Sequence, residues 1–79
     1  MTEREIHQYI EMNPFRGNEP VFWKTNIAVS HIIDDFAKGM NFEEVLKEHP
    51  QLTAKHLQAA FVYCKIALRE NEVRRIIRF

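Results

Sequence analysis

The sequence predicts a mainly α-helical fold with the layout of a small tri-helical helix-turn-helix domain. Two short helical segments are joined by three residues at 39–41, and a proline-containing turn at 50–52 separates them from a longer helix. A chain of 79 residues is too short for two independent cores. We therefore expect one domain with an N-terminal arm at 1–29, a helical core at 30–70 and a tail at 71–79.

The N-terminal arm contains both helix and strand signals. Thr2 and Glu5 have the spacing of a capping box, yet aromatic and β-branched residues before the first turn also suit a strand, so helix and strand both remain open for 3–12. Two prolines and a glycine in 13–20 indicate a bend. The aromatic and β-branched residues of 21–27 favour an extended segment.

The next two segments carry the signals that start and stop short helices. Ser30 is a good N-cap for the first, and Gly39 is a natural left-handed residue just beyond its end. Asn41 and Glu44 form a second capping-box candidate, and Pro50 ends that helix near His49.

A long helix is expected from the N-cap Thr53 to about residue 70, because no Gly or Pro interrupts this stretch. Its main apolar stripe consists of Leu57, Ala60, Phe61, Cys64, Ala67 and Leu68. A second apolar set consists of Ala59, Val62, Tyr63 and Ile66. Two short helices cannot cover both sets, so either the N-terminal arm or a second copy must do so. We expect a homodimer with an interface formed by Phe22, Trp23, Val62, Tyr63 and Ile66.

Composition excludes several classes of protein. Eleven basic and eleven acidic residues balance, 46% of residues are apolar, and no apolar run approaches the roughly 20 residues of a membrane span. The lone Cys64 cannot form an intramolecular disulfide, so a cytoplasmic location is expected. The net charge is unevenly distributed, at −1 for 1–29, −3 for 30–52 and +4 for 53–79.

The start of the long helix is the predicted DNA-binding element. In a helix-turn-helix, the first turns of the last helix enter the major groove. Here that position holds Thr53, Lys55, His56 and Gln58. Lysine suits guanine or phosphate, and glutamine suits adenine. The alternative is that these residues are simply the solvent-exposed side of an amphipathic helix.

The tail at 71–79 is apolar and cationic and is a predicted segment for binding a partner protein. Its expected contact residues are Val73, Ile76, Ile77 and Phe79. The competing interpretation of the tail is an extension of the long helix. For the whole chain, the alternative function is a protein-interaction adaptor without nucleic-acid binding, which an acidic stretch beside the start of the long helix would favour.

No residue pattern indicates catalysis, a metal or a cofactor. His56 and Cys64 are eight residues apart, about 12 Å along a helix, which is too far for one zinc ion. Asp34 and Asp35 diverge by about 100° on a helix and are expected to be solvent-facing charges. No membrane or small-molecule substrate is expected.

A series of short motifs lies between residues 17 and 63: GNEPVF at 17–22, TNIAVS at 25–30, GMN at 39–41, EEVL at 43–46, HPQLT at 49–53, and Ala59, Ala60 and Tyr63. In these motifs the chain resembles a small bacterial family, domain-of-unknown-function family 433. The resemblance implies a β-hairpin arm, with 10–12 pairing with 21–23, before a homeodomain-like core. It also implies an antitoxin component that binds operator DNA as a dimer and neutralises a toxin, often a PIN-type ribonuclease.

The chain departs from the family pattern within 24–29 and at His49, which stands where an aromatic residue is usual. Where the family typically has Gly-Thr-Arg-Ile-Pro-Val, this chain has Lys24-Thr25-Asn26-Ile27-Ala28-Val29. Asn26 replaces an arginine, so any function that depends on that guanidinium is in doubt.

Overall fold

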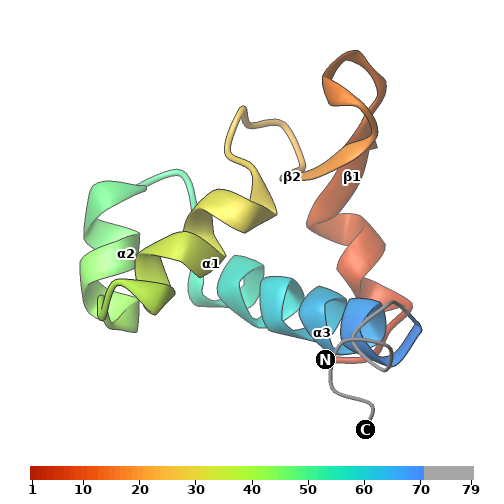
Figure 1. Ribbon diagram of the computed structural model, residues 1–79. Helices are drawn as coiled ribbons and strands as arrows, with labels where there is room; N and C mark the ends of the chain where they lie inside the picture. The colour runs from red at the N-terminus through yellow and green to blue at the C-terminus, as the bar shows by residue number, and fades with distance from the viewer. Residues whose placement is uncertain (71–79) are drawn as a thin grey trace, which may run out of the picture.

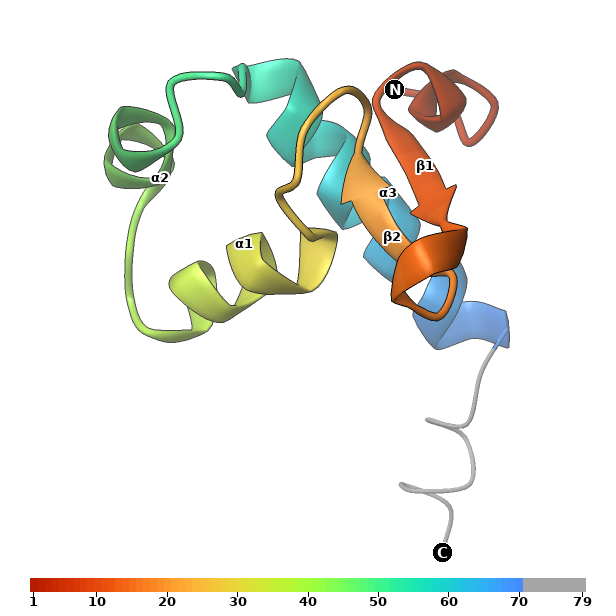
Figure 2. The same ribbon diagram turned by 90° about the horizontal axis from the view of Figure 1, so that it is seen from above.

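The computed structural model describes residues 1–70, so the predicted partner-binding residues of the tail lie outside the described residues. The described part holds a two-stranded hairpin, β1 (Ile10–Asn13) and β2 (Glu19–Phe22), and three helices, α1 (Val29–Ala37), α2 (Phe42–Glu48) and α3 (Ala54–Glu70). The long α3 runs beneath the other elements (Figure 1). Seen from above, the hairpin lies over α3, with α1 and α2 to one side (Figure 2). The mainly α-helical helix-turn-helix fold with an N-terminal hairpin is thereby confirmed.

The first part of the arm contains both of the elements that the sequence left open. A 3₁₀ helix spans Glu5–Gln8, and β1 follows it directly. The strands are antiparallel, with Ile10 opposite Phe22 and Met12 opposite Pro20. The predicted bend between them is a 3₁₀ turn, Pro14–Arg16, which is followed by Gly17 in the left-handed conformation.

The extended segment expected at 21–27 ends early, at Phe22. The chain turns back because the Phe22 N–H donates to the carbonyl of Ile27 at 3.0 Å. The Thr25 hydroxyl holds this loop closed, donating to the carbonyl of Phe22 at 2.9 Å and accepting the N–H of Ile27 at 3.0 Å. Lys24 adopts a left-handed φ of 61°, which explains why a glycine suits this position in the family pattern.

The predicted N-cap of α1 is wrong by two residues. Ala28 occupies the cap position, and Ser30 already lies inside the first turn. The Ser30 hydroxyl donates instead to a carboxylate oxygen of Glu19 at 3.1 Å and so ties α1 to β2. The C-terminal end of α1 matches the prediction, because Gly39 has a left-handed φ of +100°. The Gly39 N–H donates to the carbonyl of Phe36, and the Met40 N–H donates to the carbonyl of Asp35, as in a Schellman motif.

Both later helices have a side chain that caps their first turn. The Asn41 side chain accepts the Glu44 N–H, and the Glu44 carboxylate accepts the Asn41 N–H, each at 2.9 Å, which confirms the predicted capping box of α2. At α3 the Thr53 N–H donates to Nδ1 of His56 at 2.9 Å. Histidine thus takes the place that glutamate or glutamine holds in a capping box.

The core forms where the arm and α1 both meet α3. Its fully buried side chains include Phe22, Ile32, Val45 and Leu57. Ala59 and Ala60 are also at 0% exposure, and the 3₁₀ helix and β1 pack against α3. Within residues 1–70, no helix is long and apolar enough to cross a membrane.

The predicted main apolar stripe of α3 is partly wrong, because Phe61 is 43% and Leu68 is 56% exposed. The second set is the better covered one, since Ala59 is buried and Val62, Tyr63 and Ile66 pack partly against the core. The N-terminal arm supplies this cover. A second copy is therefore not needed to hide that set.

Replacing Lys24 by glycine should stabilise the protein by about 1 kcal/mol, because a left-handed conformation costs a side-chain-bearing residue about that much. The measurement is the free energy of unfolding in urea. Lys47→Gly is the control: Lys47 is an exposed lysine within α2, and glycine there should destabilise by about 1 kcal/mol. A loss of stability in both variants would contradict the conclusion that Lys24 is strained in this loop.

Candidate functional site

The first two turns of α3 present three of the four predicted DNA-binding residues to solvent. Thr53, Lys55 and Gln58 are exposed, as is Ala54 between them. The helix follows α2 after a turn of only five residues, 49–53. These side chains therefore stand at the end of α3 that a helix-turn-helix inserts into the major groove.

His56 does not project outward as predicted. Its ring is partly buried and packs edge-on against Tyr9, with ring centroids 5.2 Å apart, and against Phe22 at 5.8 Å. Its Nδ1 accepts the Thr53 N–H, so the imidazole is neutral in this arrangement. Burial lowers the pKa of His56 below its ordinary value of 6.5. The residue caps the start of α3 from a partly buried position.

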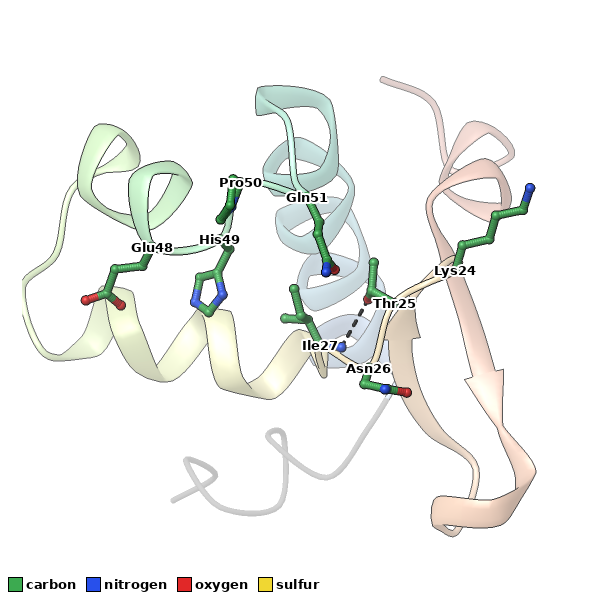
Figure 3. Close-up of a pocket in the computed structure, with 8 residues that line it drawn as sticks. All are labelled: Lys24, Thr25, Asn26, Ile27, Glu48, His49, Pro50 and Gln51. Atoms are coloured by element: carbon green, nitrogen blue, oxygen red, sulfur yellow. Dashed lines mark hydrogen bonds between the residues drawn. The ribbon is translucent and has the colours of Figure 1, made fainter.

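A cleft of about 660 Å³ lies beside this end of α3, between the loop after β2 and the turn after α2. Its lining residues are Lys24, Thr25, Asn26, Ile27, Glu48, His49, Pro50 and Gln51 (Figure 3). In Figure 3 the side chains of Lys24 and Glu48 point away from each other at opposite ends of the cleft. The cleft lies between two of the segments that carry the family resemblance, 25–30 and 49–53.

The acidic stretch of 34–48 is largely engaged within the protein. The Asp34 carboxylate pairs with Nζ of Lys38 at 2.9 Å, and Glu44 caps α2. That ion pair, through its hydrogen bond and charge, raises the pKa of Lys38. Glu43 and Glu48 are exposed, and Glu48 lies closest in sequence to the start of α3.

Asp35 corrects a further prediction, because it is buried rather than solvent-facing. The residue is 6% exposed, and its Oδ2 lies 3.2 Å from Nε2 of His49. His31, one helical turn before Asp35 on α1, places its Nε2 3.9 Å from the same oxygen. Sequence reasoning missed this group, although the spacing of His31 and Asp35 puts them on one helix face.

The predicted dimer interface is only partly available. Phe22 is fully buried in the core and cannot contact a second copy. Val62, Tyr63 and Ile66 are partly buried against the core, whereas Trp23 is 49% exposed. The interface prediction is therefore wrong for Phe22, because β2 turns this side chain inward onto α3.

A different apolar surface is exposed at the junction of the three helices. The rings of Phe42 and Phe61 stack with centroids 5.9 Å apart and planes 9° apart, and each residue is 43% exposed. Phe36 packs against both rings, at 5.2 and 5.3 Å. We call Phe36, Phe42 and Phe61 the aromatic stack.

The fold and the exposed start of α3 define a small helix-turn-helix domain with an N-terminal hairpin. The family described as Protein of unknown function (DUF433) matches residues 10–64, which is more than half of the chain. The chain belongs to this family. No curated protein and no solved structure matches it.

The capping role of His56 predicts a pH dependence of stability. Above about pH 6.5 His56 is neutral in both the folded and the unfolded chain. As the pH falls below that value, the unfolded chain takes up a proton that the folded protein resists, so stability should fall. His56→Gln, which keeps a side chain able to cap, should flatten this decline in urea unfolding between pH 8 and pH 5.

The control is His7→Gln, which removes an exposed histidine from the 3₁₀ helix. An equal flattening in both variants would show that the decline does not arise at the start of α3.

Proposed function

We propose that the chain binds double-stranded DNA through the start of α3, as an antitoxin-like regulator that acts as a homodimer. The observation that carries this proposal is the exposure of Thr53, Lys55 and Gln58 on the first turns of a long helix that follows a short turn. Lysine and glutamine are side chains that read guanine and adenine edges in the major groove.

The charge distribution supports the same proposal. Five acidic side chains lie in 34–48. Three of them make contacts within the protein: one with Lys38, one with His49 and one in the cap of α2. The ion pair with Lys38 offsets the charge of Asp34 and so lowers the repulsion that phosphates would meet. Lys55 and Lys65 remain exposed along α3.

The antitoxin part of the proposal extends the family resemblance. Such a regulator would act in the cytoplasm, bind the operator of its own gene and neutralise a partner toxin, for which a PIN-type ribonuclease is the leading candidate. The tail at 71–79, with its apolar and cationic side chains, is the proposed toxin-binding segment.

Changing Lys55 and Gln58 together to alanine should weaken binding to duplex DNA from the region upstream of the chain's own gene by at least about tenfold, because each base contact contributes roughly 1–3 kcal/mol. Gel shifts at several salt concentrations measure this effect. Wild-type affinity should fall steeply as salt increases.

Lys65→Ala is the matched control, since it removes the same charge from α3 about 15 Å farther along the helix axis. Equal losses in the two variants would indicate nonspecific attraction to phosphate. Unchanged affinity in the double variant would reject the proposed DNA-binding surface.

A second candidate function is protein interaction without DNA binding, and the aromatic stack favours it. Exposed aromatic rings are typical centres of protein interfaces. On this proposal a second copy or another protein covers Phe42 and Phe61, and α3 contacts no nucleic acid.

Phe61→Glu should abolish self-association if the stack is the dimer interface, because a carboxylate buried among aromatic rings is strongly unfavourable. Sedimentation equilibrium of the full chain at micromolar concentrations measures the mass. Phe15→Glu is the control, since Phe15 is 96% exposed at the hairpin tip. A wild-type monomer throughout this range would reject a dimer at the stack.

A further inference from the structure

A group of two histidines and one aspartate lies at the join between α1 and the turn after α2. Within residues 1–70, His31, Asp35 and His49 form a set whose candidate ligand atoms all lie within 4.8 Å of one another. His31 and Asp35 come from successive turns of α1. His49 directly follows the last residue of α2, and Figure 3 shows its ring directed toward α1.

The distances require the exposed histidine to move inward before they match a tetrahedral metal site. Nitrogen and oxygen ligands bind Zn²⁺ at about 2.0–2.2 Å, which places two ligands of a tetrahedron roughly 3.3 Å apart. Nε2 of His49 lies 3.2 Å from Oδ2 of Asp35 and needs no adjustment. Nε2 of His31 lies 3.9 Å from that oxygen, and an exposed histidine side chain can make up the difference by a small rotation.

The three side chains also differ in burial as the ligands of an open metal site do: two are buried and one is exposed. Asp35 and His49 have only 9% and 16% of their side-chain surfaces exposed, whereas His31 has 60%. A small hollow lined by Asn26, Ile27, Ala28, His31 and His49 opens beside the group. A bound ion would therefore have three protein ligands and one position accessible to water.

Electrostatics favours a cation here. Among the described residues Asp35 is the buried charged side chain, and its hydrogen-bond partner is a histidine. Burying a carboxylate is costly unless it is paired with a positive charge or coordinates a metal. A divalent ion supplies that charge, and two imidazoles with a carboxylate form a donor set that suits zinc.

We propose that His31, Asp35 and His49 form a binding site for a divalent transition-metal ion, with Zn²⁺ as the expected occupant. The ion would join α1 to the turn that sets the position of α3. On binding, Nε2 of His49 would become a metal ligand in place of its hydrogen bond to Asp35, with the imidazole proton on Nδ1. The proposal does not depend on DNA binding.

The test is titration of the full chain with Zn²⁺ alone, by calorimetry, and with Co²⁺, whose visible absorption reports tetrahedral nitrogen and oxygen ligands. We expect one ion per chain. His31→Gln should weaken binding by at least about tenfold, since it removes one of three ligands. His31 is exposed, so circular dichroism of this variant should match that of the wild type.

His7→Gln is the control for adventitious binding to a surface histidine and should bind as the wild type does. Asp35→Asn should also lose binding, and where it fails to fold, His31→Gln alone decides. Absence of binding to the wild-type chain, or unchanged affinity in His31→Gln, would overturn the site and leave Asp35 and His49 as a hydrogen-bonded pair only.

Discussion

The packing of the N-terminal arm against α3 is the constraint on which the rest of the structure depends. A long helix with apolar side chains around most of its circumference needs cover on two sides. α1 and α2 cover one side, and the 3₁₀ helix with β1 covers the other. The small side chains of Ala59 and Ala60 allow other elements to approach α3 closely. Phe22, at 0% exposure, fills the space between the hairpin and α3. The hairpin is thus an integral part of the core.

The parts of the fold that could be predicted from the sequence are those set by short-range interactions. The capping box of Asn41 and Glu44 and the left-handed Gly39 depend on residues within five positions of one another. Ser30 was misplaced because its hydroxyl bonds Glu19, eleven residues away. The orientation of Phe61 was likewise undetermined, because helical spacing shows which residues share a face but not which face the arm covers.

The candidate site shows the same contrast between residues set by local sequence and residues set by tertiary packing. Exposure of Lys55 and Gln58 follows from their position at the start of an amphipathic helix. His56 lies on the same turn, but its environment depends on Tyr9, a residue distant in sequence that only tertiary packing brings near. The pairing of Asp35 with His49 across 14 residues depends on the angle between two helices, which no local pattern specifies.

The small sheet has one edge that cannot recruit another strand. Successive N–H groups of a strand point to opposite sides, and the Phe22 N–H faces away from β1 because it donates to Ile27. Pro20, two residues earlier, faces the same side and has no N–H. The outer edge of β2 therefore offers no free amide donor at either position. This feature protects the outer edge of the hairpin from fibril-like pairing with neighbouring molecules.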